Sequence, residues 1–596
     1  MTNITKIKRD RMINFLEELK SAHTDDEAIR AFNEIENALT EKKFGLVFEE
    51  HTEEVDERLL NEIPVFCADE TRKICKDKDL PYNFIIEGDN LQALYLLEKT
   101  HRGKVDCIYI DPPYNTGARD WKYNNDYADK NDIFRHSKWL SMMHSRLIIA
   151  KKLLTDDGVL ICAIDENEQA NLHLLLEDIF GVSYSIDCIT IEHNPRGVQG
   201  KNFSYTHEYA LFVYKKGEKV ILDRKLNEEE IKPSQFRNWG AESLRSDAKN
   251  CFYPVYVKDE EIIGFGDVIT DENIHPNKNE IDENDVVAVY PIDNEGIERK
   301  WRYARQTVDE IKDLLLVKKN RQGILEINIA KKFGKYKTVW SHKKYDANKW
   351  GTQLINSMVP HNDFNFPKSL YNVYDCLAAV IRDKPDAIVL DFFAGSGTTM
   401  HALNLLNTED NGNRKCILVT NNALSEKQEK ALKERGYSPG DEEWEKLGIA
   451  KYITWPRIFC SIEGTNILGE ELTGTYLNTN REMSQGFNAN VKYFKCDWTP
   501  RKPEDYLLSY ALLLHIKEMI ELEHFIEIDN ERYVVILNKD DFNNYILNEE
   551  IYSKIEKVWV NQNIIFTSED LQLLNNKDFR YIPREYFGHE LKEAAE

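Results

Sequence analysis

The sequence predicts an α/β protein whose doubly wound, Rossmann-like sheet is interrupted by an inserted domain. From about residue 83, short apolar runs alternate with helical segments, and the alternation resumes after a long polar stretch. Continuous apolar runs separated by helices are typical of strands buried on both faces of a parallel-type sheet. The 596 residues exceed one ordinary domain of about 100–200 residues, so we expect several domains.

Residues 8–43 are predicted to form two amphipathic helices. Apolar residues recur there at helical spacing, in the sets Met12, Phe15, Leu16, Leu19 and Ile29, Phe32, Ile35, Leu39. Thr24 and Glu27 between the two sets match a capping box. We therefore expect an N-terminal helical segment over residues 1–50, serving in packing or dimerisation.

The first α/β alternation follows this helical segment. Strands are expected at 84–86, 105–110 and 159–164, with a strand at 209–214 closing the block, and helices at 91–97, at 139–154 and before Gly181. Residues 51–189 are assigned to the first part of the sheet domain.

Residues 190–360 break this rhythm, because they are polar, rich in Asn and Lys, and offer only one clear helix, near 307–318. The alternation then resumes with helices at 370–382 and 398–406 and strands at 387–392 and 416–420. We therefore expect an inserted domain at 190–360 and the second part of the sheet domain at 361–460. Residues 461–596 are assigned to a small C-terminal α/β domain, with a helix at 507–522 and strands near 533–537 and 558–566.

The net charge of −25 argues against nucleic-acid binding, because phosphate contacts need Lys and Arg. However, residues 190–350 are close to neutral in charge. One run there contains a single acidic residue, Asp346, and the lysines Lys331, Lys332, Lys335, Lys337, Lys343, Lys344 and Lys349. Two interpretations stay open: a local basic surface, or a solvated loop.

Several classes of protein are not expected. No apolar stretch reaches the roughly 18 residues of a membrane span, and the first residues lack the apolar run of a secretory signal. The ten cysteines are scattered without a CxxC pair, which argues against structural zinc or a disulfide framework. We expect a cytoplasmic protein with no metal site and no membrane contact.

The first motif is DPPYNTG at residues 111–117, directly after a predicted strand. Ligands of open α/β sheets bind beyond the carboxyl ends of such strands. These residues suit a ligand that carries an amine on an aromatic ring. Such an amine is a poor nucleophile because its lone pair is delocalised, and the Asp111 carboxylate with the Pro112 carbonyl can hold its two hydrogens and let the nitrogen pyramidalise. Pro112 and Pro113 fix φ and remove donors, while Tyr114 offers a flat face for stacking. The alternative is a Pro-Pro turn that merely ends a strand.

The second motif is DFFAGSGTT at residues 391–399, between a predicted strand and a predicted helix. Its glycines allow close approach of the backbone to a ligand, and the helix N-terminus presents free N–H groups. This arrangement favours a nucleotide-like cofactor. It is not a P-loop, because no Lys follows the second Gly, so ATP hydrolysis is not expected.

Together these motifs resemble the adenine-specific DNA methyltransferases of the β-type motif order, in which DPPY precedes FxGxG. The resemblance covers about residues 80–460. Between and around the two motifs it includes, in the expected order, Lys138-Trp139-Leu140, Asp157-Gly158-Val159 and His207-Glu208-Tyr209. The chain is similar in particular to the modification (Mod) subunit of type III restriction-modification systems.

This resemblance implies methyl transfer from S-adenosylmethionine to N6 of adenine in double-stranded DNA. It also implies that residues 190–360 are the target-recognition domain, that a restriction (helicase-nuclease) subunit is a partner, and that the chain is a homodimer. In these families a Ser in the place of Asp111 usually marks cytosine N4 as the target, so Asp111 favours adenine.

The family pattern also implies roles for single residues. The catalytic positions are Asp111, Pro112, Pro113 and Tyr114. The cofactor-binding positions are Asp89, Asn90, Lys368, Asp391, Phe393, Ala394, Gly395, Gly397 and Thr398. The segment at Lys368 departs from the pattern, because Ser369 follows the lysine here, where the family more often has Pro. The ribose contact stays open, since Asn421 and Asn422 stand where many relatives carry an acid.

Two other functions compete with this one. The same fold can methylate RNA, although the long insertion suits reading of duplex DNA better. A non-catalytic DNA-binding subunit is the second, which the intact DPPY segment disfavours. Asp165 and Glu166 are expected to cap the following helix, and five histidines are expected to be structural: His136, His193, His207, His342 and His361.

Overall fold

The computed structural model describes residues 11–17, 19–20, 26–40, 48, 53–123, 126–129, 134–217, 219–226, 231–320, 322–477, 479–501, 512–583 and 586. The chain divides into two compact units. The first comprises Met1–Val220, Thr338–Thr475 and Arg481–Glu596, and the second Ile221–Lys337 with Tyr476–Asn480. Of the predicted N-terminal hairpin, helix α2 (Asp26–Thr40) is present, whereas Thr24 of the expected capping box lies outside the described residues.

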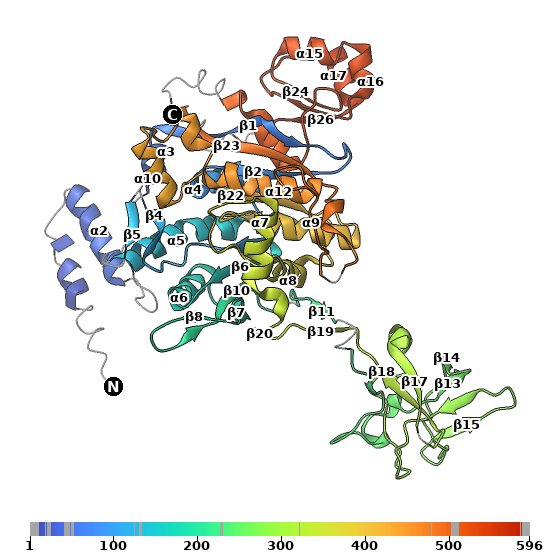
Figure 1. Cartoon of the computed structure of the whole chain (residues 1–596). Coiled ribbons are helices and arrows are strands. Elements are labelled where there is room, and N and C mark those ends of the chain that lie inside the picture. The colour runs from blue at the N-terminus through green and yellow to red at the C-terminus, as the bar shows by residue number, and fades with distance from the viewer. Residues whose placement is uncertain are drawn as a thin grey trace. The chain divides into compact units, whose positions relative to one another are not determined.

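A ten-stranded mixed sheet forms the centre of the first unit (Figure 1). Its order is β1 (Glu62–Ile74), β23 (Asn490–Pro500), β2 (Tyr82–Glu87), β22 (Lys415–Thr420), β21 (Ile388–Asp391), β3 (Val105–Ile110), β6 (Leu154–Ile164), β10 (His207–Lys215), β7 (Tyr184–Glu192) and β20 (Val339–Trp340). The strands from β23 to β6 are parallel to their neighbours. β1 and β10 run antiparallel to theirs.

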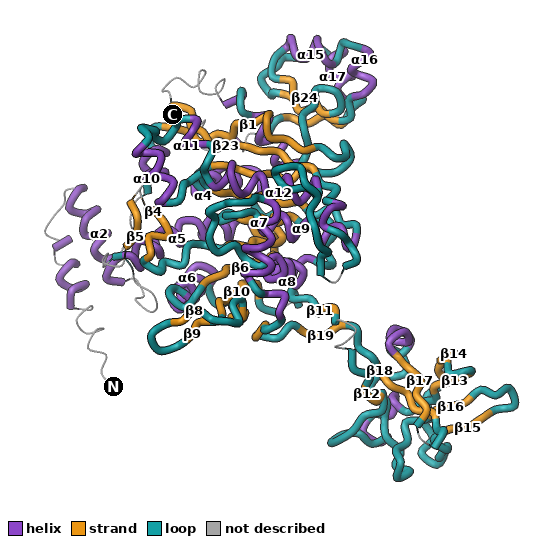
Figure 2. The backbone as a smooth tube through the Cα atoms, viewed as in Figure 1, coloured by secondary structure: helices purple, strands orange, loops and turns teal. Residues whose placement is uncertain are grey.

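Helices cover both faces of this sheet, as the helical and strand segments in Figure 2 show. One group shares the main hydrophobic core: α4 (Asn90–His101), α5 (Arg135–Leu153), α6 (Gln169–Phe180) and α14 (Ile516–His524). The other group packs together around α8 and α9 and comprises α7 (Leu354–Met358), α8 (Leu370–Ile381), α9 (Thr398–Asp410) and α12 (Trp455–Glu463). In β3, Ile108 and Ile110 belong to the first core, while Cys107 and Tyr109 between them are also buried. Since successive side chains point to opposite faces, both faces are covered, as the apolar runs predicted.

At both lateral edges of the sheet, the structure adds strands that the sequence did not predict. β7 pairs with β10 along its whole length, and β1 and β23 form the opposite edge. β23 lies within residues 461–596, so the segment assigned to a C-terminal domain contributes a strand to the main sheet. The sequence hides β23 because it contains lysine, but Lys492 is buried and its Nζ lies 2.7 Å from a carboxylate oxygen of buried Glu521.

The second unit consists of short antiparallel strands around its own core. The sheets are β14-β13-β16-β15, β12-β18-β17 and β11-β19, formed by β11 (Asp223–Lys225), β12 (Ser234–Gln235), β13 (Val255–Lys258), β14 (Glu261–Phe265), β15 (Asn279–Ile281), β16 (Val287–Val289), β17 (Leu315–Lys319), β18 (Leu325–Ile329) and β19 (Phe333–Lys335). The unit is narrower than the inserted domain expected at 190–360, because β10 and β20 belong to the main sheet.

The helix expected near 307–318 is wrong. A short 3-10 helix, Asp309–Leu314, is followed at once by β17, which pairs antiparallel with β18. Within β17 the side chain of Leu315 is buried and that of Leu316 is exposed, so the apolar run has the period of a strand. Tertiary pairing with β18 therefore decides the conformation.

The last part of the chain has the expected α/β character. Three parallel strands, β24 (Tyr533–Ile536), β25 (Lys557–Val560) and β26 (Asp578–Tyr581), are connected by α15 (Lys539–Tyr545), α16 (Glu549–Lys554) and α17 (Ser568–Asn575). The predicted helix at 507–522 overlaps α14, and residues 502–511 lie outside the described part. Among the helices that the structure describes, none has the length and apolar character to cross a membrane.

Candidate active site

The two predicted motifs meet at the carboxyl ends of the central parallel strands. β3 and β21 are parallel neighbours, with Ile108 opposite Leu390, so Asp111 directly after β3 and Asp391 at the end of β21 lie at the ends of adjacent strands. β6 is parallel to β3 on the other side and leads into Asp165. Because the carboxyl ends of parallel strands share an edge, these carboxylates gather where α/β proteins bind ligands.

A compact cluster of polar side chains surrounds Asp111. The Lys368 ammonium lies 3.0 Å from Asp111 Oδ1 and 2.8 Å from Glu208 Oε2. Lys368 also donates to the Tyr114 hydroxyl, which in turn donates to Glu208 Oε2 at 3.1 Å. The structure thus places Lys368 beside the DPPY segment, whereas the resemblance grouped it with the cofactor residues.

The charges of this cluster shift one another's pKa values. Burial raises the pKa of Asp111, and the nearby Glu208 raises it further, while Lys368 opposes both. Burial favours the neutral form of Glu208 too, but Lys368 and His193 outweigh it, so the pKa of Glu208 is lowered. Burial works against the charge of Lys368, yet Asp111 and Glu208 together raise its pKa. The arrangement is therefore a shared ion pair.

The loop after Asp111 is held by buried contacts. Asn115 adopts the left-handed conformation at φ 57° and donates to the Arg135 carbonyl at 3.3 Å and to buried Glu168. Trp139 Nε1 donates to the Pro113 carbonyl at 2.7 Å. The indole therefore engages the Pro113 carbonyl. His136 contacts Glu168 as well, in agreement with its expected structural role.

The second motif forms a tight turn between β21 and α9. Gly395 and Gly397 have φ of 49° and 78°, which side chains disfavour, and Gly397 immediately precedes α9. Asp391 accepts hydrogen bonds from the Phe393 amide at 3.0 Å and from the Thr399 hydroxyl. Burial raises the pKa of Asp391 to about 7. The turn thus presents backbone at a helix N-terminus, as a cofactor cradle requires.

A buried arginine on α12 supports this turn from behind. Arg457 Nη1 donates at 2.7 Å to both the Ser396 and the Thr398 hydroxyls. Thr454 donates to the Gly395 carbonyl at 2.6 Å. The Thr398 hydroxyl thereby accepts a hydrogen bond from the protein.

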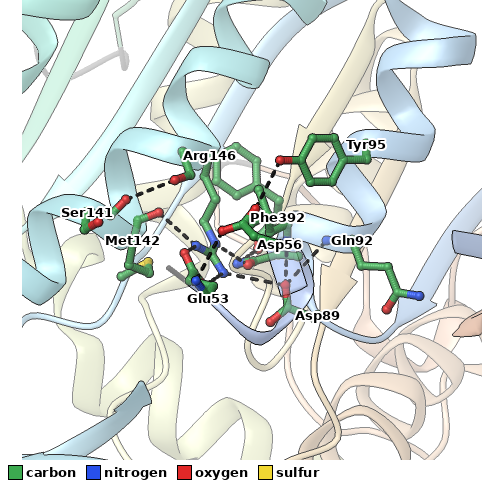
Figure 3. A network of polar contacts seen from close by, with 12 residues as sticks. Glu53, Asp56, Asp89, Gln92, Tyr95, Ser141, Met142, Arg146 and Phe392 are labelled. Atoms are coloured by element: carbon green, nitrogen blue, oxygen red, sulfur yellow. Dashed lines mark hydrogen bonds and ion pairs between the residues drawn. The ribbon is translucent and has the colours of Figure 1, made fainter. Parts of the chain in front are cut away.

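The turn after β2 is joined to the second motif by a polar network (Figure 3). Asp89 caps α4 by accepting from the Leu91 amide at 2.7 Å, and Asn90 donates to the Phe392 carbonyl at 2.8 Å. Buried Arg146 of α5 donates to Asn90 Oδ1 and pairs with both carboxylate oxygens of Glu53, at 2.6 and 2.9 Å. Asp89 and Asn90 are therefore fixed beside the turn that follows β21.

The sequence interpretation missed three buried charges. Glu208 lies in the mostly apolar strand β10 and is only 1% exposed, and Arg146 and Arg457 are buried on helices. A charge within a mostly apolar strand is the signal that marks Glu208, because a buried charge needs a partner. Arg146 lies in α5 among other charged residues, so no such signal marks it.

The remaining candidates lie as follows. Asp165 does not cap α6; it accepts from the Asn167 amide at 2.9 Å and side chain at 2.8 Å and so holds the preceding turn. Asn422 donates to the Glu445 carbonyl at 2.7 Å and is part of the loop structure. Within the part of the chain that is described, no three His, Cys, Asp or Glu side chains are grouped to hold a metal ion.

Comparison with known proteins identifies the family. Residues 105–418, more than half of the chain, match the family model described as DNA methylase. This range contains both motifs and the Ile221–Lys337 part of the second unit. The chain belongs to this family of DNA methylases, and the predicted DNA methyltransferase is confirmed.

Relatives come from two kinds of restriction-modification system. The type II methyltransferase M.KpnI of Klebsiella pneumoniae is 34% identical over 354 residues, which cover 56% of this chain and 79% of that protein. The EcoPI Mod subunit of Escherichia phage P1, a type III enzyme, is 29% identical over 426 residues, 63% of each protein. The type III StyLTI Mod subunit of Salmonella typhimurium is 30% identical over 392 residues, 61% of this chain and 55% of that protein. The matches thus span less than two thirds of these two Mod subunits.

Solved structures align with low scores. The M1.HpyAVI-SAM complex has a TM-score of 0.26 at 14% identity, covering 59% of this chain and 97% of that chain. The cytosine-N4-specific PvuII DNA methyltransferase has a TM-score of 0.28 at 12% identity, covering 62% and 93%.

Proposed function

We propose that this chain transfers a methyl group from S-adenosylmethionine to the N6 amine of adenine in duplex DNA. The observation that carries the proposal is the position of the Asp111 carboxylate, at the end of β3 and next to the glycine turn that follows β21. Membership of the DNA methylase family supports the reaction, and aspartate at position 111 supports adenine over cytosine.

The glycine turn suits the methyl donor. Gly395 and Gly397 lie in the left-handed region, and α9, whose first turn offers N–H groups, begins directly after Gly397. Bound there, S-adenosylmethionine supplies an electrophilic methyl group. Phe393 is half-buried beside the turn, and Asp89 and Asn90 are held against it through Phe392. These residues would bind and orient the donor.

Asp111 and Pro112 serve the acceptor amine. The lone pair of N6 is delocalised into the purine ring, so the nitrogen must pyramidalise before it attacks. The Asp111 carboxylate and the Pro112 carbonyl accept its two hydrogens and stabilise that geometry. As the N6–CH₃ bond forms and the S–CH₃ bond breaks, N6 must lose a proton, and Asp111, whose pKa is raised by burial, is the acceptor at hand.

We assign the chain to the modification side of a restriction-modification system. Three further relatives carry the names of type III Mod subunits or type II methyltransferases, which supports this setting. A restriction (helicase-nuclease) partner, a homodimer and DNA reading by the second unit are parts of the same proposal. Co-purification with the product of the neighbouring reading frame tests the partner, and capture of no helicase-nuclease would leave a solitary methyltransferase.

The product is expected to be N6-methyladenine. Purified protein would be incubated with S-adenosylmethionine labelled in the methyl group and with mixed genomic DNA, and the digested nucleosides would be separated. RNA of the same base composition serves as the competing acceptor. Label in N4-methylcytosine, in 5-methylcytosine or in the RNA would contradict the proposal.

The basic run from residue 331 to 349 divides between the two units. Lys344 is buried and its Nζ lies 2.6 Å from a carboxylate oxygen of Asp375, so this lysine is no part of a basic surface. Lys335 and Lys337 are exposed in the second unit. Of the two interpretations, a basic surface or a solvated loop, the first can therefore apply only to the exposed lysines of the run.

Neutralising Lys335 and Lys337 is expected to weaken DNA binding equally for all sequences. A lysine is a flexible point charge suited to phosphates, while base edges favour bidentate side chains. Changing both to Gln should reduce the slope of log affinity against log salt by roughly one unit per lost contact. Lys312→Gln, at an exposed position of the same unit, is the control. An unchanged slope would mean that both lysines are only solvated, and a changed methylation site would mean that they read bases.

A further inference from the structure

A buried lysine is shared by two carboxylates at the proposed acceptor site. The Lys368 side chain is 10% exposed, that of Glu208 1% and that of Asp111 27%. The ammonium lies 3.0 Å from Asp111 Oδ1 and 2.8 Å from Glu208 Oε2. An unpaired charge is costly in such a place, so the three groups depend on one another.

Glu208 is fixed from several elements of the fold. It stands on β10, and its Oε1 accepts from Asn372 Nδ2 of α8 at 2.8 Å. Its Oε2 accepts from the Tyr114 hydroxyl at 3.1 Å and from Lys368. Both carboxylate oxygens are thus engaged, and Glu208 has no remaining freedom to follow a substrate. Its position is that of an anchor.

Lys368 is also placed against the ring of Tyr114. Its Nζ lies 4.5 Å from the centre of that ring and donates to the ring's hydroxyl, so the ammonium sits at the hydroxyl edge of Tyr114. Lys368 therefore contacts both groups that the proposed function assigns to the acceptor.

We propose that Lys368 and Glu208 are positioning residues for methyl transfer, in which the Lys368 ammonium keeps the Asp111 carboxylate ionised and aligned and Glu208 anchors that ammonium. The inference rests on the proposed function and goes beyond it, because it moves Lys368 from the cofactor to the acceptor. An ionised Asp111 offers only acceptor lone pairs to the amine, whereas a protonated one would present an O–H donor.

Each charged group around Asp111 acts on its ionisation in a definite direction. Burial favours the protonated form, Glu208 adds to this effect, and Lys368 opposes it. The other titratable groups that face this cluster are Tyr109 on β3, Tyr114, His193, His207 on β10, Asp165 after β6, Cys376 on α8 and Asp391 on β21. Lys368 and Glu208 act on Asp111 with opposite signs, and the Lys368 ammonium lies within ion-pair distance of both carboxylates.

The test is the pH dependence of kcat/KM for DNA, which reports ionisations of the free enzyme. Lys368→Met removes the opposite charge, so the acid limb of the profile should move upward by about one unit or more. Glu208→Gln keeps a hydrogen-bonding side chain but removes the like charge, so the limb should move downward. Lys368→Arg keeps the charge and should leave the limb near its original place.

A matched control separates this effect from the loss of any buried ion pair. Lys344 has the same side-chain exposure, 10%, and pairs with Asp375 at 2.6 Å, without a contact to Asp111. Lys344→Met should leave the acid limb unmoved. Should Lys368→Met fail to fold, the double variant Lys368→Met/Glu208→Gln removes both charges, and its limb should lie between those of the wild type and Lys368→Met. Thermal unfolding of each variant records folding separately.

The outcomes are distinct. Opposite shifts of the limb in Lys368→Met and Glu208→Gln support the proposal, and equal or absent shifts overturn it. A weaker binding of S-adenosylmethionine in Lys368→Met with an unmoved limb would return Lys368 to the cofactor site. Failure of the proposed function would show in the wild-type protein, which would then put no methyl group on adenine.

Discussion

Replacing Asp111 by alanine is expected to lower kcat at least a thousandfold. Each lost decade corresponds to about 1.4 kcal/mol of transition-state stabilisation, so the expected loss is roughly 4 kcal/mol. The carboxylate is assigned to the acceptor amine alone, and Lys368 retains Glu208 as its partner in the variant. The affinity for S-adenosylmethionine should therefore stay within about threefold. Single-turnover transfer of labelled methyl groups and calorimetric titration with the cofactor measure the two quantities.

Gly395→Val provides the opposite pattern as a control. Gly395 has a φ of 49°, which a β-branched residue strongly disfavours, and its turn is assigned to the cofactor. This variant should lose cofactor affinity first, with turnover largely retained at saturating cofactor. An Asp111→Ala protein that keeps more than a tenth of wild-type turnover would refute the role of the carboxylate.

The central strands and the site-bearing turns could be predicted because their signals are local. The strands expected at 105–110, 387–392 and 416–420 correspond to β3, β21 and β22, and each is a short apolar run followed by a turn. A run of this kind is buried whichever strand pairs with it, so its sequence is sufficient. The DPPY and glycine turns directly follow two such strands. Because these strands are parallel, both turns lie at the carboxyl end of the sheet.

The outermost strands of the sheet and the buried ion pairs could not be predicted in this way. β1 pairs with β23, more than four hundred residues away. β1 begins with an apolar run at residues 63–68 but continues through charged residues, and β23 is interrupted by lysines. Lys492 and Lys344 look like solvated lysines in the sequence, and the resemblance assigns Lys368 to the cofactor, yet each is buried against a carboxylate from another segment. Such pairings depend on tertiary contacts, and the same is true of Arg146.

Arg146 is the centre of a buried network at the cofactor side of the site (Figure 3). Its side chain is 4% exposed, and it donates to Glu53, to Asn90 and to the Met142 carbonyl at 2.8 Å. Asn90 in turn donates to the Phe392 carbonyl. Arg146 thus links the segment before β1, the turn after β2 and the turn after β21, so its removal should affect both folding and the cofactor.

Arg146→Met is expected to destabilise the first unit by about 3–5 kcal/mol, because it leaves the Glu53 carboxylate buried without its partner. Thermal unfolding monitored by calorimetry measures the loss, and cofactor affinity should fall in parallel. Glu53→Leu/Arg146→Met removes both charges and should be less destabilised than the single variant. Arg102→Met breaks the exposed pair with Glu98, whose atoms lie 2.7 Å apart, and should cost less than about 1 kcal/mol. Equal losses in Arg146→Met and Arg102→Met would contradict a structural role for the buried network.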